Sequence, residues 1–251
     1  MNTRTKGVLV GVSLGPGDPE LLTRAAWNAL ESARCWAWPI VRKGAESYAL
    51  SILKRTTLVP PEIQLPLVFP MTRDRTTLTE HWQVAAQAII EVLHQGIDCH
   101  FLVEGDASFY ATFRHLEGAV RGMDPEIVSR VIPGVASPLA AAGVSGRALC
   151  DGDERVAIIP ATVGMADIAA ALDHFEVVVL MKVRAVWQPL LQLMEQRHLL
   201  DQAVFVERVG SPEQRVIHDV AHLRDADIHY LSLMILYNHA GEAGLGMKGR
   251  S

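Results

Sequence analysis

The chain has 251 residues, 49% of them apolar and 20% charged, and a formal net charge of −5. This balance excludes a largely disordered chain and disfavours a general nucleic-acid-binding surface. No apolar stretch approaches the roughly 18–20 residues of a membrane-spanning helix, and the N-terminal segment lacks the pattern of a secretory signal. We therefore expect a cytoplasmic globular protein that binds neither membranes nor nucleic acids.

In the first half of the chain, strand-like runs alternate with helical patterns. Short apolar runs predict strands at residues 7–12, 35–40 and 98–103. Apolar residues at helical spacing predict one helix within residues 22–33 and a longer one within residues 82–93. This alternation is typical of α/β architecture.

The second half repeats the alternation. A helix of small residues is expected after Pro138, and residues 241–251 form a polar, glycine-rich tail. Five further strands are predicted, at residues 126–132, 156–160, 176–182, 203–207 and 229–237.

The chain is long enough for two α/β domains. Strand and helix content is similar on both sides of residues 121–124, so we place the boundary there. The expected division is an N-terminal α/β domain over residues 1–121, a C-terminal α/β domain over residues 122–240, and the tail.

The residue types that ligate metals show no pattern of a metal site. The three cysteines, Cys35, Cys99 and Cys150, are widely spaced and odd in number, which indicates reduced thiols rather than a disulfide framework or a CxxC site. The ten histidines show no HxH or HExxH spacing. We expect no protein-bound metal.

The first motif, GVSLGPGDPELLT at residues 11–23, follows the first predicted strand. It lacks the lysine of a P-loop and the spacing of a dinucleotide fingerprint. Pro16 removes a backbone donor, and Asp18 and Glu20 place negative charge where an anion would bind. Asp18 is also suited to cap the following helix, with Pro19 in its first turn. The loop either holds a ligand that is not an anion or is a tight turn without a ligand.

Two further motifs follow strands. In GDASFYATF, residues 105–113, Asp106 either accepts a hydrogen bond from a ligand or caps a helix. In IPGVASPLAAAG, residues 132–143, a Pro-Gly turn and small residues allow either close approach of a ligand or tight helix packing.

In this order the three motifs resemble the class III, tetrapyrrole-type methyltransferases that use S-adenosylmethionine. Four more segments extend the resemblance over nearly the whole chain: LPLVFPMTRD, DGDERVAIIPAT, VVVLMK and VFVERVG. Together they are similar to the branch of the family that methylates precorrin-2 at C20 in cobalamin biosynthesis. Ala136 stands where the family often has a hydroxyl residue.

The resemblance implies two unequal α/β domains with an active site in the cleft between them, usually in a homodimer. It implies a folded S-adenosylmethionine bound largely by backbone atoms and leaving as S-adenosylhomocysteine. The implied cofactor contacts are Pro16, Glu104, Gly105, Asp106, Phe109, Ala136, Ser137, Met181, Arg208 and Val209. Asp106, Tyr110 and Asp18 are implied to orient pyrrole N–H groups or to move a proton.

The implied substrate is a tetrapyrrole with several carboxylate arms, so a chain of net charge −5 must present local positive charge. The candidate substrate contacts are Arg73, Asp74, Arg75, Asp153 and Lys182, and Arg147 and Arg208 also lie near the motifs in sequence. The alternative for each of these residues is an ordinary surface charge that binds no ligand. The alternative enzymatic functions are methylation of uroporphyrinogen, of another corrin position, of diphthamide or of ribosomal RNA. A non-catalytic tetrapyrrole carrier is the alternative from another functional class.

Overall fold

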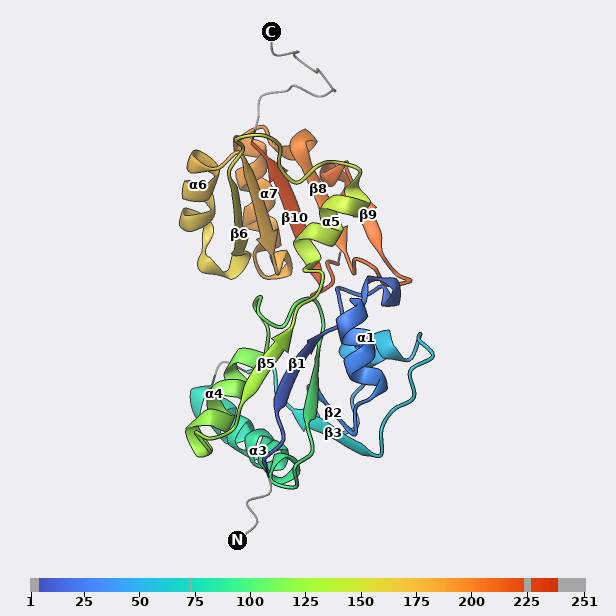
Figure 1. The fold of residues 1–251 in the computed structure, drawn as a ribbon. Coiled ribbons are helices and arrows are strands. Elements are labelled where there is room, and N and C mark those ends of the chain that lie inside the picture. The colour runs from blue at the N-terminus through green and yellow to red at the C-terminus, as the bar shows by residue number, and fades with distance from the viewer. Residues whose placement is uncertain (1–4, 73, 224–226, 239–251) are drawn as a thin grey trace. The chain divides into compact units, whose positions relative to one another are not determined.

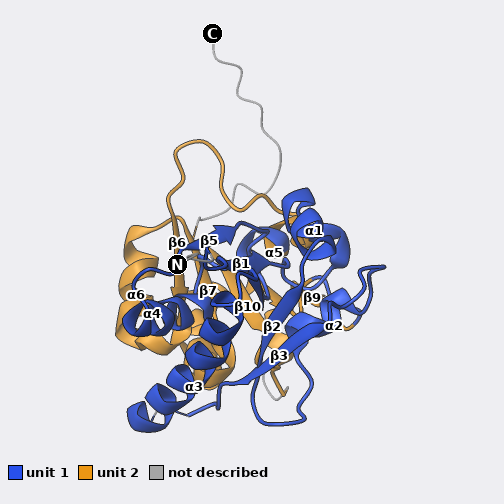
Figure 2. Ribbon diagram, turned by 60° about the horizontal axis from the view of Figure 1, so that its bottom comes forward, with its two compact units in different colours: residues 1–140, 210–212 blue, residues 141–209, 213–251 orange. Residues whose placement is uncertain are grey.

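The computed structural model describes residues 5–72, 74–223 and 227–238. Its contacts divide the chain into two compact units, coloured separately in Figure 2. Unit 1 comprises Met1–Ala140 and Gly210–Pro212, and unit 2 comprises Ala141–Val209 and Glu213–Ser251. The tail predicted at 241–251 lies outside the described residues.

Unit 1 contains a parallel sheet with the strand order β3-β2-β4-β1-β5 among the described residues (Figure 1). Its strands are β1 (Leu9–Ser13), β2 (Cys35–Ile40), β3 (Ile63–Val68), β4 (Cys99–Val103) and β5 (Ser129–Ile132). We did not predict β3, which carries Pro66 and is the edge strand, where a missing backbone donor is tolerated.

The position of β5 explains where the units divide. We expected the boundary near residue 121, whereas the contacts place it between Ala140 and Ala141. The reason is that β5 pairs with β1 in parallel, from Leu9 opposite Ser129 to Val12 opposite Ile132. Sequence periodicity reports a strand but not the sheet it joins.

Helices cover both faces of the unit 1 sheet (Figure 1). On one face, α1 (Arg24–Glu31) and α2 (Tyr48–Leu53) bury Leu30 and Ile52 against Trp36. On the other, α3 (Arg75–Leu93) and α4 (Phe113–Met123) pack against Phe101. Because both faces are covered, the strands read as nearly continuous apolar runs.

Unit 2 contains a mixed sheet with the order β6-β7-β10-β8-β9. Its strands are β6 (Val156–Pro160), β7 (Val177–Met181), β8 (Ala203–Glu207), β9 (Arg215–Ile217) and β10 (Ser232–Tyr237). Strand β10 runs antiparallel to β7 and β8, so its first residue lies beside their carboxyl ends. The prediction missed only β9 among these strands, because it is three residues long.

The helices of unit 2 are α6 (Met165–His174) and α7 (Trp187–Gln196), which bury Ile168 and Leu190 against one sheet face. The helix α5 (Ser137–Ser145) begins in unit 1 and ends in unit 2. Short 3-10 turns complete the chain: η1 (Pro19–Leu21), η2 (Ala161–Val163), η3 (Val183–Val186), η4 (Leu200–Gln202) and η5 (Val220–Leu223). The α/β class predicted from the sequence is confirmed.

Candidate functional site

The three motifs lie at the carboxyl ends of neighbouring strands. Strand β1 is flanked by β4 and β5, and all three run in the same direction. The loops that follow them therefore leave one edge of the unit 1 sheet side by side. We call them the β1 loop (residues 14–18), the β4 loop (residues 104–112) and the β5 loop (residues 133–136). In open α/β sheets this edge is where ligands bind.

Backbone hydrogen bonds join the β1 and β4 loops. Gly15 and Gly105 form an isolated antiparallel bridge, with N···O distances of 3.2 Å from Gly15 to Gly105 and 2.7 Å in the opposite direction. Both glycines have positive φ angles, 73° and 71°. Glycine adopts this conformation more readily than residues with a side chain, so glycine at both positions favours the meeting of the two loops.

Asp106 ties the β4 loop to the β5 loop. Its Oδ2 accepts a hydrogen bond from the backbone N–H of Gly134 at 2.7 Å, and its Oδ1 accepts from the N–H of Ser108 at 2.8 Å and from the Ser108 hydroxyl. Burial alone would raise the pKa of Asp106, but these hydrogen bonds outweigh it and hold the pKa below its ordinary value. Asp106 is therefore an ionised clamp between two loops.

The helix-capping alternative for Asp106 is wrong. Helix α4 begins at Phe113, with Thr112 at the N-cap position. The hydrogen bond from Ser108, two residues on, is instead a local turn that only a short polar side chain can form.

Small side chains pack the β5 loop onto the other two. A Cβ atom on Gly134 would lie 2.5 Å from the Cβ of Ser13 and 3.2 Å from the carbonyl oxygen of Gly105. Ser13 is fully buried, and its hydroxyl oxygen accepts from the N–H of Ala107 at 2.9 Å. Beyond the loop, the carbonyl of Ala136 accepts from Leu139 and Ala140 and so opens α5. The three motifs thus form one connected surface.

Side chains from α2 and its C-terminal end hold the carbonyl groups of the β1 loop. The Tyr48 hydroxyl donates to the carbonyl of Pro16 at 3.2 Å, and Arg55 donates to the carbonyl of Gly17. Neither residue was predicted from the sequence, because α2 was not predicted. Their side chains hold two consecutive carbonyl groups of the β1 loop.

Asp18 caps a different element from the one we expected. Its Oδ1 accepts from the N–H of Glu20 at 2.9 Å and caps the 3-10 turn η1. Helix α1 is capped by Thr23, whose hydroxyl accepts from Ala26 at 3.1 Å. Gly210, with a φ of 78°, lies close to the same loop, since its Cβ would be 2.6 Å from the Asp18 nitrogen. Only glycine fits both that space and that backbone conformation.

The β4 loop ends in two aromatic residues. The rings of Phe109 and Tyr110 meet edge to face, with centroids 4.7 Å apart. Tyr110 has a φ of 49° and is 50% exposed. Glu104, at the start of the loop, is also exposed.

In unit 2, predicted site residues follow β7 and β8 at one edge of the sheet. Met181 ends β7, and Lys182 follows with a left-handed φ of 59° and an N–H that donates to the carbonyl of Ser232 at 3.1 Å. Arg208 follows β8 with a φ of 49°, and Val209 is buried. Strand β10 lies between β7 and β8, so these two pairs are separated by one strand.

A buried charged cluster at this edge was missed by the sequence analysis. Glu207 is 5% exposed, pairs with Arg215 at 3.2 Å and accepts from the backbone N–H of His229 at 2.7 Å. The Nδ1 of His229 accepts from the N–H of Leu231 at 3.1 Å. Burial lowers the pKa of His229, and the charge of Arg208 adds to this. A polar residue ending an apolar strand was the only sequence signal.

The predicted substrate residues are divided between the two units: Asp74 and Arg75 lie in unit 1, and Asp153 and Lys182 in unit 2. Asp74 caps α3 by accepting from Thr77, and Arg75 is the first residue of that helix. The hydrogen bonds from Thr77 lower the pKa of Asp74. Asp153 is exposed in a turn of unit 2, and Arg73 lies outside the described residues.

No group of three or more His, Cys, Asp or Glu side chains in residues 5–72, 74–223 and 227–238 is placed to hold a metal ion. No helix in the same ranges is long and apolar enough to cross a membrane.

Some curated proteins match this chain over most of the length of both sequences. The chain is 30% identical to a precorrin-2 C(20)-methyltransferase from Sinorhizobium sp over 92% of this chain and 95% of that protein. It is also 30% identical to the cobalt-precorrin-2 C(20)-methyltransferase of Salmonella typhimurium, over 92% of this chain and 96% of that protein.

Solved structures share the fold at lower identity. A cobalt precorrin-4 methyltransferase matches with a TM-score of 0.66 at 15% identity, covering 91% of this chain and 94% of that chain. The uroporphyrin-III C-methyltransferase of Thermus thermophilus, complexed with S-adenosyl homocysteine, matches with a TM-score of 0.61 at 20% identity, covering 92% and 97%. The family model for tetrapyrrole (corrin/porphyrin) methylases matches residues 8–223. The chain belongs to the tetrapyrrole (corrin/porphyrin) methylase family.

Proposed function

We propose that this protein transfers the methyl group of S-adenosylmethionine to C20 of a precorrin-2-type tetrapyrrole in cobalamin biosynthesis. The observation that carries the proposal is the match, over almost the full length of both chains, to two relatives that bear this activity in their names. The connected β1, β4 and β5 loops supply a surface suited to it.

The residues of the β4 loop fit such a cofactor. A Cβ on Gly105 would meet nothing within 4 Å, so open space lies over the bridged backbone. The β1 loop is formed by glycine and proline, and its carbonyl groups are held by side chains from α2 and the residue pair after it. It lacks the lysine and the glycine spacing of a phosphate-binding loop. We propose contacts from Pro16, residues 104–106 and Phe109 in unit 1. The further proposed contacts are Ala136, Ser137, Met181, Arg208 and Val209.

When bound, this cofactor supplies an electrophilic methyl group on a sulfonium centre. The chain needs no side-chain nucleophile, and its work is to align the two reactants and to exclude water. Asp106 serves by holding the β4 and β5 loops together, since both of its oxygens are occupied. We assign it a positioning role.

Asp18 and Tyr110 are better placed than Asp106 to meet the substrate. Oδ1 of Asp18 accepts the capping bond from Glu20, and within residues 5–72, 74–223 and 227–238 no donor is seen on the second oxygen, which is suited to a pyrrole N–H. Tyr110 is half exposed on the β4 loop, which already belongs to the surface. Arg75, Lys182 and Arg208 remain proposed partners of substrate carboxylates.

Calorimetry with S-adenosylhomocysteine separates a methyltransferase from a non-catalytic tetrapyrrole carrier, which would not need the cofactor loops. Micromolar or tighter binding is expected, and no binding would contradict the proposal. The position of methylation is then tested with S-adenosylmethionine carrying a ¹³C-methyl group. The protein is incubated with this labelled cofactor and precorrin-2, with and without cobalt. An NMR signal at C20 is expected, and label at any other carbon would overturn the C20 assignment.

We further infer that the enzyme works in the cytoplasm as a homodimer. The cytoplasmic location rests on the three widely spaced cysteines, whose odd number and spacing indicate reduced thiols. The dimer rests on the family resemblance. Sedimentation equilibrium at micromolar concentration is expected to give twice the mass of 27.5 kDa, and a monomer would contradict the inference.

A further inference from the structure

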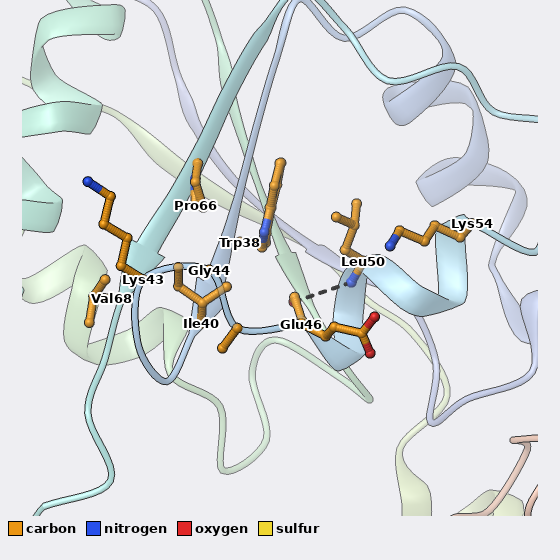
Figure 3. A pocket seen from close by; sticks show the side chains of 11 residues that line it. Trp38, Ile40, Lys43, Gly44, Glu46, Leu50, Lys54, Pro66 and Val68 are labelled. Carbon is orange, nitrogen blue, oxygen red and sulfur yellow. Dashed lines mark hydrogen bonds between the residues drawn. The ribbon is translucent and has the colours of Figure 1, made fainter.

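A pocket of about 430 Å³ lies in unit 1, away from the three motif loops in sequence (Figure 3). Its volume falls within the range of about 300–1,000 Å³ that small-molecule sites occupy. Trp38 and Ile40 of β2 and Val68 of β3 form its apolar wall, and α2 adds Leu50. The sequence analysis assigned nothing to this region.

Two lysines flank the apolar wall. Lys43, from the segment after β2, and Lys54, at the end of α2, stand on opposite sides of the pocket (Figure 3). Within the described part of the chain, neither ammonium group has an ion-pair or hydrogen-bond partner, and Glu46 is the acid in the lining. The pocket therefore carries an excess of positive charge over a wall that contains a Trp ring. These features suit a ligand with an apolar body and carboxylate arms.

The pocket lies at the same sheet edge as the motif loops. Strands β2 and β3 run parallel to β4, β1 and β5, so their carboxyl ends share that edge. Strand β2 pairs directly with β4, which carries the Gly105 and Asp106 loop.

Helix α2 links the pocket to the β1 loop. It contributes Leu50 and Lys54 to the pocket, while Tyr48 in its first turn donates to the carbonyl of Pro16. Arg55, directly after Lys54, donates to the carbonyl of Gly17. A ligand held by Lys54 thus contacts the element that fixes the backbone of the β1 loop.

We propose that this pocket is a subsite for carboxylate arms of the tetrapyrrole substrate, with Lys43 and Lys54 pairing with two arms and Trp38 packing against the macrocycle edge. The proposal rests on the proposed function for its substrate class. It differs from the substrate residues expected from the sequence, which lay near recognisable motifs.

The test is a fluorescence titration of the full chain with uroporphyrin III, a stable tetrapyrrole with acetate and propionate arms. The double variant Lys43→Gln/Lys54→Gln is expected to bind about tenfold more weakly, and the wild-type protein is expected to lose affinity more steeply with salt than the variant does. The matched control is Arg42→Gln, which removes one charge from the same exposed segment but does not line the pocket. It is expected to bind as the wild type does.

Two results would overturn the subsite. One is an unchanged dissociation constant for uroporphyrin III in the double variant, and the other is an equal loss in Arg42→Gln, which would indicate a diffuse charge effect. Binding of S-adenosylhomocysteine, measured on the same samples, is expected to be unchanged. If the wild type binds uroporphyrin III through the two lysines but does not bind S-adenosylhomocysteine, the subsite proposal is supported and the methyltransferase proposal fails.

Discussion

The two units build the carboxyl edges of their sheets in different ways. In unit 1 the edge is made of backbone, with Gly15 bridged to Gly105 and the N–H of Gly134 held by Asp106. In unit 2 the edge is made of charged side chains, with Glu207 buried between Arg215 and the backbone of His229.

The two edges therefore tolerate different substitutions. A backbone surface depends on glycine at positions of positive φ or close approach, and on one carboxylate that joins two loops. A side-chain surface depends on charge balance, because a buried carboxylate that loses its partner is left uncompensated. We expect changes in unit 1 to alter ligand binding through shape, and changes at the unit 2 edge to alter stability first.

The largest effect is expected for Asp106→Asn. The amide keeps one acceptor for Ser108 but would turn its NH₂ group toward the N–H of Gly134, which leaves a donor facing a donor. Affinity for S-adenosylhomocysteine, measured by calorimetry, should fall about 10–100-fold while the circular dichroism spectrum is kept.

The matched control for this change lies at the other end of the same strand. Asp98 precedes β4 and accepts from the backbone N–H of Val8 at 2.8 Å. Asp98→Asn makes the same chemical change at the amino edge and should leave the affinity unaltered. If both variants lose affinity equally, Asp106 has no special role in the loop surface.

A smaller loss of binding is expected for Gly134→Ala. The added methyl group would lie 2.5 Å from the Cβ of Ser13, so the serine that holds Ala107 must move. Affinity for S-adenosylhomocysteine should fall about tenfold. Gly118→Ala in α4 is the control, because its Cβ would meet nothing within 4 Å and alanine favours helix. Normal affinity in Gly134→Ala would show that the β5 loop does not shape the site.

Much of this edge was predictable from the sequence. Strand runs, glycine spacing and motif order gave the α/β class and the loops around Gly15, Asp106 and Gly134. Strand order brings these loops side by side, because β1 lies between β4 and β5 although the three segments are far apart in the chain. Parallel pairing leaves no local signal, which is also why the sequence did not indicate that β5 joins the unit 1 sheet.

The residues that were not predicted from the sequence escaped prediction for related physical reasons. Tyr48 and Arg55 act through a short helix without clear periodicity, and Lys43 and Lys54 look like ordinary surface charges in sequence. Glu207 looked like the end of a strand. For Tyr48, Arg55 and Glu207 the role comes from a tertiary contact, and for the two lysines the proposed role comes from their place beside a pocket. Composition and spacing indicate neither.

The unit 2 edge is tested by Glu207→Gln. The amide can still accept from the N–H of His229 but loses the ion pair with Arg215, whose side chain is 44% exposed. The free energy of unfolding should fall by about 1–2 kcal/mol, measured by urea denaturation. Asp173→Asn, which breaks an exposed pair with Arg197 in the same unit, should cost less. An equal or smaller cost for Glu207→Gln would remove the distinction between the two edges.

The smallest effects are expected at the amino edges, where the two units are alike. In unit 1, hydrogen bonds from Lys6 and His94 lower the pKa of Asp124 to about 2. In unit 2, side-chain and backbone hydrogen bonds from Arg155 lower the pKa of Glu176 to about 2. The basic partner of each pair, Lys6 or Arg155, lies just before the first strand of its unit, and the acidic partner lies before another strand of the same sheet.

A carboxylate with a depressed pKa in the folded state stabilises it fully above the unfolded value of about 4, and this contribution is lost as the pH falls toward about 2. Thermal unfolding followed between pH 5 and 2 should therefore show a steeper loss of stability in the wild type than in Asp124→Asn or Glu176→Gln. The two variants should flatten the acid slope to a similar, small extent, because both groups are at the surface. An effect confined to one variant would show that the units differ at both edges, and the contrast could no longer be assigned to the carboxyl edges alone.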